Sequence, residues 1–250
     1  MRLRGVTITG LEGKPEAILS AALGEASLPG PLRVWGNPEI LLAPRAAIAG
    51  SRQASPRSLA AIEGLAVALA QRGLCLVSGG AHGTDCAAHA ACLGAGGRTV
   101  VVLPCALEDI DLATWRPRLA GLWNEERTLF VSPFAPGYRP TRSSPVLRNR
   151  LIASLAQAAV AGETGLQGGT NHFLTFAHER RLPIFLLDVY GEDPAMAQAL
   201  ALFRQQGART FTPDDAFSGG FADHIARAAT VWRPAPRPGG QLALFGEDAP

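Results

Sequence analysis

The chain has 250 residues, of which 47% are hydrophobic and 18% charged, and this composition excludes a wholly disordered protein. Its apolar runs are short and broken by glycine or charge, which excludes a membrane span. The formal net charge of +2 is only mildly basic, so overall charge does not mark the chain as a nucleic-acid-binding protein.

The cysteines, the N-terminal residues and the basic residues indicate the cellular location of the chain and the contacts that it can make. The cysteines form no C-x-x-C pair, so we expect reduced, buried thiols and no metal site at Cys75, Cys86, Cys92 and Cys105. The first 16 residues lack the apolar core of an export signal, which predicts a cytoplasmic protein. Lys14 is the only lysine, and arginine suits bidentate phosphate contacts, although the bias can equally arise from the composition of an alanine-rich chain.

Residues 1–45 are expected to form an N-terminal extension leading into the domain, with a short helix at 15–23 and a short strand at 32–35. From 46 to 232 apolar strands alternate with helices, which predicts an α/β fold with a doubly wound, mostly parallel sheet. Strands are expected at 46–49, 74–77, 99–103, 128–132, 158–161 and 184–187, the last closing the sheet. Helices are expected on both faces, at 55–72, 85–95, 113–122, 146–156, 170–181, 194–206 and 217–231.

The stretch Leu74–His89 is the first candidate for a binding site. Its strand ends in a turn containing Ser78, Gly79, Gly80, His82 and Gly83, and a helix follows, with Asp85 able to accept N–H groups at the helix start. Such a turn aims backbone N–H groups and a helix dipole at one point, which suits a phosphate. An ordinary strand-to-helix turn explains the same residues, and the dinucleotide fingerprint G-x-G-x-x-G is not met.

Three loops should converge at the carboxyl edge of the sheet. They are Gly50-Ser51-Arg52, the turn at 78–83, and the loop at 166–170 with Gly168, Gly169 and Thr170. Together they predict an anion site, with Thr170 as the N-cap of its helix. Arg148, Asn149 and Arg150 are expected to open another helix, downstream of Arg139 and Arg142. Cations there oppose the helix dipole, which favours phosphate binding over a structural role.

Catalytic residues are not predicted. His82 faces the expected site, His89 is expected to pack inside its helix, and Glu163 lacks a positioned partner for acid–base chemistry. No nucleophile elbow, Walker motif or metal cluster is present in the sequence. The chain is therefore expected not to be an enzyme.

Residues 31–188 resemble the DprA/Smf DNA-processing family of the Rossmann-like SLOG superfamily. The similar segments are IAGSR at 48–52, VSGGAHGTDCAAH at 77–89, RNRLIA at 148–153, TVVVL at 99–103 and VWGN at 34–37. The resemblance implies an extended Rossmann fold that binds single-stranded DNA through its glycine loops and arginines. It also implies self-association into a homodimer and a helper role towards RecA in recombination or transformation.

The chain departs from that family at several points. Pro133 replaces an acidic residue, LQGGTN at 166–171 replaces the family's S-G-S-L-x-T-A, and the family's C-terminal winged helix has no counterpart. The turn at 168–170 also resembles the loop of LOG-type phosphoribohydrolases, which need a glutamate that is absent after Thr170. A nucleotide N-glycosidic hydrolase and a nucleotide-sensing module without nucleic acid therefore remain the alternatives.

The chain ends in a segment of different composition. Residues 233–240 form a Pro/Gly linker, and the tail at 241–250 begins QLALF. Gln241, Leu242, Leu244 and Phe245 resemble the peptide by which bacterial proteins dock on the DNA polymerase sliding clamp, and they could equally fold back onto the domain.

Overall fold

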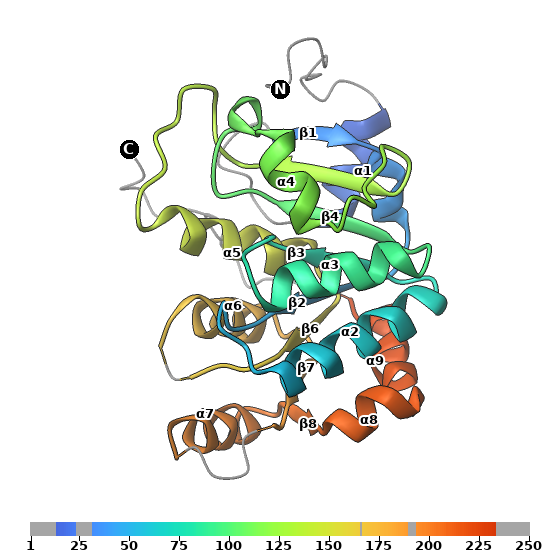
Figure 1. Ribbon diagram of the computed structural model, residues 1–250, viewed down its shortest axis with the longest axis vertical. Helices are drawn as coiled ribbons and strands as arrows, with labels where there is room; N and C mark the ends of the chain where they lie inside the picture. The colour runs from blue at the N-terminus through green and yellow to red at the C-terminus, as the bar shows by residue number, and fades with distance from the viewer. Residues whose placement is uncertain (1–13, 24–31, 166, 190–193, 234–250) are drawn as a thin grey trace.

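The computed structural model describes residues 14–23, 32–165, 167–189 and 194–233 (Figure 1). Within these residues eight strands form one sheet in the order β1-β5-β4-β3-β2-β6-β7-β8. Every neighbouring pair is parallel except β1 with β5. The strands are β1 (Arg33–Gly36), β2 (Arg45–Ala49), β3 (Cys75–Ser78), β4 (Arg98–Val102), β5 (Thr128–Ser132), β6 (Ala158–Ala161), β7 (Ile184–Leu187) and β8 (Arg209–Phe211).

Helices cover both faces of the sheet (Figure 1). One apolar core joins the sheet to α1 (Lys14–Leu23), α5 (Ser144–Leu155), α6 (Gly169–Glu179) and α7 (Pro194–Gln205). The opposite core joins it to α2 (Pro56–Gln71), α3 (Thr84–Gly94), α8 (Pro213–Ser218) and α9 (Gly220–Val231). A third cluster packs α4 (Leu112–Arg118) near β1 and β5. The predicted α/β, doubly wound, mostly parallel fold is confirmed.

Local chemistry explains why the elements begin where they do. Ser55 caps α2 by accepting the Ser58 N–H, with Pro56 at the first helical position. The central strands are buried along their whole length, which matches their continuous apolar sequences. Among the described residues, no helix combines the length and the apolarity that crossing a bilayer requires.

Four predicted elements differ from the structure. β8 lies outside β7, so 184–187 does not close the sheet. The predicted helix at 217–231 is divided because Gly219 takes a left-handed conformation between α8 and α9. The helix predicted at 113–122 ends at Arg118, followed by Ala120 and Gly121 at positive φ. The strand predicted at 32–35, within the N-terminal extension, forms at 33–36 and pairs with β5 in the same sheet.

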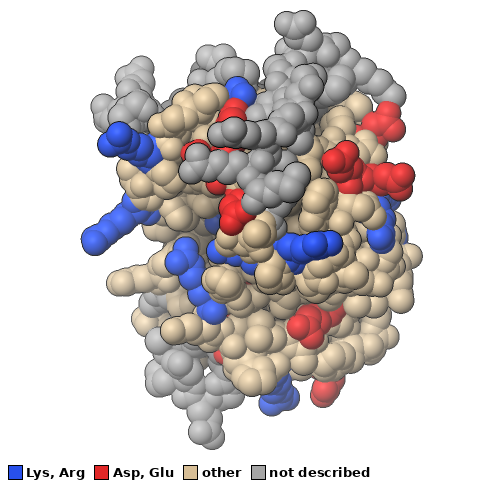
Figure 2. Space-filling view, turned by 45° about the horizontal axis from the view of Figure 1, so that its top comes forward, with Lys and Arg blue, Asp and Glu red and all other residues tan. Residues whose placement is uncertain are grey.

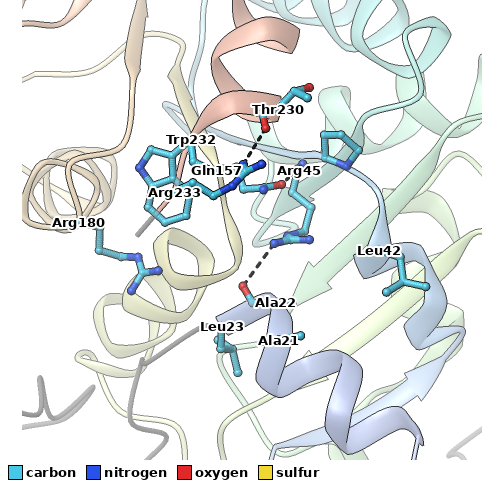
Figure 3. A pocket seen from close by; sticks show the side chains of 11 residues that line it. Ala21, Ala22, Leu23, Leu42, Arg45, Gln157, Arg180, Thr230, Trp232 and Arg233 are labelled. Atoms are coloured by element: carbon cyan, nitrogen blue, oxygen red, sulfur yellow. Dashed lines mark hydrogen bonds between the residues drawn. The ribbon is translucent and has the colours of Figure 1, made fainter. Parts of the chain in front are cut away.

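The amino edge of the sheet is held together by one buried arginine. The guanidinium of Arg45 donates to the backbone oxygens of Leu155, Leu41, Ala43 and Ala22. Figure 3 shows this side chain beside a cavity of about 310 Å³ that Trp232 and Arg233 also line. Burial lowers the pKa of Arg45. Because its N–H groups are turned to carbonyl oxygens, this arginine serves to join α1 and the segment after β1 to the sheet.

The strand order places a switch point at β2. The chain proceeds outwards from β2 through β3, β4 and β5, and then returns to place β6 on the other side of β2. The carboxyl ends of the parallel strands lie at the left of Figure 1. In open α/β sheets, ligands bind in the crevice outside such a switch point, between the loops that diverge there.

Candidate nucleic-acid interface

Two neighbouring cavities open at this edge. The switch-point cavity, about 290 Å³, lies between the loops that follow β2 and β6. Its lining is Ala49, Gly50, Ser51, Arg52, Ala81, Asp85, Pro145, Arg148, Asn149, Glu163, Thr164, Gly165, Gln167, Gly168, Gly169 and Thr170. The tryptophan cavity, about 350 Å³, is lined by Arg52, Gly79, Gly80, Ala81, His82, Pro104, Cys105, Trp115, Arg118, Pro145 and Arg148. The three predicted loops therefore meet, as expected.

Backbone hydrogen bonds fix these loops to one another. Ser51 donates its N–H to the Glu163 carbonyl at 2.9 Å, and Thr84 donates its N–H to the Ser51 carbonyl at 3.2 Å. The carboxylate of Glu163 accepts the N–H of Ser55, at the start of α2. Loops held in this way form the cavity before any ligand arrives, which lowers the entropic cost of binding.

Neighbouring protein atoms fill the space beside the glycines of the turn after β3. A Cβ on Gly79 would lie 1.8 Å from Nη1 of Arg148, and one on Gly80 would lie 2.3 Å from Cζ3 of Trp115. Gly83, at φ 80°, would place a Cβ 2.5 Å from the Ser51 carbonyl. These positions therefore require glycine for packing inside the protein, whereas the sequence pattern predicted a turn that binds a phosphate.

The glycine turn before α6, in contrast, has empty space beside it. Gly168 has φ 101°, and a Cβ there would meet no atom within 4 Å. Gly168, not Thr170, is the N-cap, and no side chain caps this end of the helix. The predicted cap at Thr170 is wrong because the helix begins at Gly169. The uncapped first turn of α6 faces the switch-point cavity and is suited to an anion.

Arg148 lies in the second turn of α5 and is buried, with 5% of its surface exposed. Its Nη1 donates to the Val102 carbonyl at 2.7 Å and its Nε to Oδ1 of Asn149 at 3.1 Å. The prediction that Arg148 opens a helix is wrong, since α5 begins at Ser144. Asn149 in turn donates to the Gly169 carbonyl at 2.9 Å, which links α5 to the start of α6.

Asp85 is the buried acidic counterpart of Arg148. Burial raises the pKa of Asp85, and the charge of Arg148 and the Ala81 N–H oppose that rise. Burial lowers the pKa of Arg148, which Asp85 opposes. The two groups therefore support each other's charged forms in the wall of the switch-point cavity. Asp85 holds the turn rather than capping α3, whose N-cap is Gly83.

Three predicted site residues line neither cavity. The Ser78 hydroxyl donates to the Ile48 carbonyl at 2.5 Å, Gly83 packs against the loop after β2, and the guanidinium of Arg150 lies 4.8 Å from the centre of the Phe176 ring. His89 is fully buried, and its burial lowers its pKa to about 3. The neutral imidazole bonds Thr99 through Nδ1, so it packs, as the sequence indicated.

Two of the basic residues that the motifs singled out are exposed at this edge, and a third basic residue there was not predicted. Arg52 and His82 are exposed, and Arg118 is half-buried in the wall of the tryptophan cavity. Figure 2 shows basic side chains projecting from the left of the molecule, the side of the carboxyl ends. Trp115 and Arg118 were not predicted; a Trp-x-x-Arg spacing on a helix after β4 is the signal that could have found them. Phe173, an aromatic residue of α6 near these loops, is wholly buried.

The acidic side chains at this edge are held by backbone N–H groups of the protein itself. Glu163 accepts the Ser55 N–H, and Asp85, which is buried in the wall of the switch-point cavity, accepts the Ala81 N–H. Within the described ranges no three His, Cys, Asp or Glu side chains gather as metal ligands. All four cysteines are free thiols, two of them buried.

Comparisons with known proteins agree with this arrangement. The family model for DNA recombination-mediator protein A matches residues 17–219. A DprA-type DNA processing protein of Mycobacterium tuberculosis is 36% identical over 223 residues, covering 87% of this chain and 55% of that protein. The chain thus spans about half the length of the curated relatives it matches.

Solved structures give the same result. DNA processing protein A from Streptococcus pneumoniae aligns with a TM-score of 0.67 and 26% identity, over 79% of this chain and 69% of that one. The protein from Helicobacter pylori, whose structure was described for its single-stranded DNA binding mode, aligns with a TM-score of 0.68 and 25% identity. That alignment covers 86% of this chain and 96% of the other.

Proposed function

Because the chain belongs to the DNA recombination-mediator protein A family, we propose that it binds single-stranded DNA at the carboxyl edge of its sheet. The observation that carries the proposal is the switch-point cavity, where the exposed Arg52 faces the uncapped start of α6. The Helicobacter pylori relative, described for binding single-stranded DNA, has the same fold. The phosphate groups of the strand would lie against Arg52, Ser51 and the turn at 168–170.

The buried members of the predicted site take a positioning role in this proposal. Arg148, Asn149 and Asp85 hold the turn after β3 and the start of α6, while Gly50, Gly79 and Gly80 permit the close packing of the loops. His82 adds an exposed imidazole near Arg52. Direct phosphate contact is therefore assigned to the exposed residues of the edge.

Replacing Arg52 with alanine should weaken binding of a labelled oligothymidine by about ten-fold at low salt. The loss of one phosphate contact should also lower the slope of log K against log salt by about 0.7. Fluorescence anisotropy at several salt concentrations measures both quantities. Arg57→Ala, an exposed arginine of α2 that lines neither cavity, is the matched control. Equal losses in the two variants would contradict a site at Arg52.

The same titration separates the alternatives. If the site is a mononucleotide pocket, a free mononucleotide should compete with the oligonucleotide at low concentration, and the affinity should change little with salt. If the site binds a strand, the affinity should fall steeply with salt. An N-glycosidic hydrolase should release free base from a nucleotide. The carboxylate of Glu163 accepts the Ser55 N–H and so holds the start of α2, and we therefore favour a binding protein over this hydrolase.

We extend this proposal to DNA recombination in the cytoplasm, with RecA and a second copy of the chain as the partners that the sequence implies.

The tail segment at Gln241–Phe245 lies outside the described residues, and we propose it as a tether to the sliding clamp. Purified clamp should bind the full chain and lose binding when Leu244 and Phe245 are both replaced by alanine, as surface plasmon resonance can measure. Unchanged clamp binding would refute the tether and leave the DNA proposal standing.

A further inference from the structure

We infer that a third cavity, at the amino edge of the sheet, is a separate binding site, which takes a small phosphate monoester with an apolar body. This amino-edge cavity, about 310 Å³, is lined by Arg45, at the start of β2, and by Gln157, which directly precedes β6. It therefore lies at the opposite edge of the sheet from the two cavities at the carboxyl ends, and the inference does not depend on DNA binding.

Three arginines surround the amino-edge cavity. Figure 3 shows Arg45, Arg180 and Arg233 around it, and among the described residues that line it none carries a carboxylate. Arg45 is 7% exposed, and the partners of its guanidinium within the described ranges are all carbonyl oxygens. Because a buried charge is costly unless an opposite charge lies close to it, this lining is suited to an anion.

The carboxyl ends of helices offset only part of this positive charge. Arg45 and Arg180 each donate to a carbonyl oxygen in the last turn of α5, and Arg233 donates to one in the last turn of α9. Arg180 is also the C-cap of α6. Since a helix carboxyl end carries about −0.5 of an elementary charge, three such ends leave the three guanidiniums with a net charge of roughly +1.5.

This charge favours a phosphate monoester over other oxyanions. A phosphate monoester carries about −1.5 to −2 charges at pH 7, whereas a carboxylate or a phosphodiester carries only one. Within the described residues Arg233 uses only Nη1 for its carbonyl bonds, and Oε1 of Gln157 accepts the Arg45 N–H at 3.0 Å. Nε and Nη2 of Arg233 and the amide nitrogen of Gln157 therefore remain as donors for the ligand.

Apolar surface in the same cavity fits the body of the ligand. Leu42, Pro44 and the ring of Trp232 line it. Nε1 of Trp232 donates to the Arg181 carbonyl at 3.0 Å, and the guanidinium carbon of Arg180 lies 5.7 Å from the ring centre, so the ring is held in place. A volume of about 310 Å³ lies within the usual range of roughly 300–1,000 Å³ for small-ligand sites, which leaves room for an apolar group beside the phosphate.

Phenyl phosphate, titrated into the full chain by isothermal titration calorimetry, tests the inference. It should bind about ten-fold more tightly than benzoate, which has the ring but one charge, and than inorganic phosphate, which has the charge but no ring. Arg233→Gln and Arg180→Gln should each weaken its binding about ten-fold, because each removes a charge-assisted contact. Binding should also shift the NMR resonance of the Trp232 indole N–H, which the variant Trp232→Phe identifies.

Arg227→Gln is the matched control, because Arg227 is an exposed arginine of α9 that does not line the cavity. An equal loss in this control would overturn the inference, and so would phenyl phosphate binding no tighter than that of benzoate. Arg52→Ala should leave phenyl phosphate binding unchanged; a loss there, with Arg233→Gln unaffected, would place the ligand at the carboxyl edge and overturn the inference. Oligothymidine binding should be the same in Arg233→Gln as in the wild type, so the DNA proposal stands or fails separately.

Discussion

Arg148→Met is expected to lower the free energy of unfolding by about 3–5 kcal/mol, because it leaves a buried carboxylate without its compensating charge. Arg148 is 5% exposed and Asp85 is 6% exposed, so water replaces little of the lost interaction. The Val102 carbonyl also loses its donor. Urea denaturation followed by circular dichroism measures the change at pH 7.

Arg150→Met is the control for helix position and charge. Arg150 lies in the same helix and is half-buried over Phe176, so its loss should cost about 1 kcal/mol or less. The double variant Arg148→Met/Asp85→Leu should recover part of the lost stability, because removing both charges is less costly than removing one. A double variant as unstable as the sum of its single variants would show that Arg148 acts independently of Asp85.

Gly80→Ala is expected to destabilise the protein by about 3 kcal/mol, since it combines backbone strain with overpacking. Gly80 has φ 69°, and the new Cβ would lie 2.3 Å from the fixed ring of Trp115. A fall in the melting temperature of roughly 6–12 °C should follow for a chain of this size. Differential scanning fluorimetry measures it.

Gly73→Ala isolates the packing contribution. Gly73 has φ 78°, close to that of Gly80, but a Cβ there would meet no atom within 4 Å. Its substitution should therefore cost only the backbone strain, about 1 kcal/mol. If the two variants melt at the same temperature, the close approach of Trp115 to the turn does not contribute to stability.

Gly80 and Arg148 show where sequence reasoning succeeded and where it did not. The motif at 77–89 predicted a glycine turn, and the structure has one at the carboxyl end of β3. The sequence could not show that Arg148 and Trp115 fill the space beside Gly79 and Gly80, since both neighbours come from segments distant in the chain. Similarly, Arg148 was recognised as a member of the site, but its burial depends on the packing of α5 across the ends of β3 and β4.

The alternation of apolar strands and helices was sufficient to predict six strands within one residue at each end, and the parallel, doubly wound fold. This succeeded because buried parallel strands need continuous apolar runs and because strand ends are marked by glycine, serine and proline, which are local properties. β8 was missed because Arg209–Phe211 is a short edge strand with one exposed and one buried end.

The sequence by itself determined the fold class, the family and the convergence of three loops at one edge of the sheet. Only the tertiary structure decided which groups at that edge face a ligand: Arg52 and the turn at 168–170 are exposed, Arg148 is buried, and Trp115 with Arg118 forms a second cavity. The physical reason is that strand identity follows from local apolar patterns, whereas exposure depends on which distant side chains fill the space beside each loop.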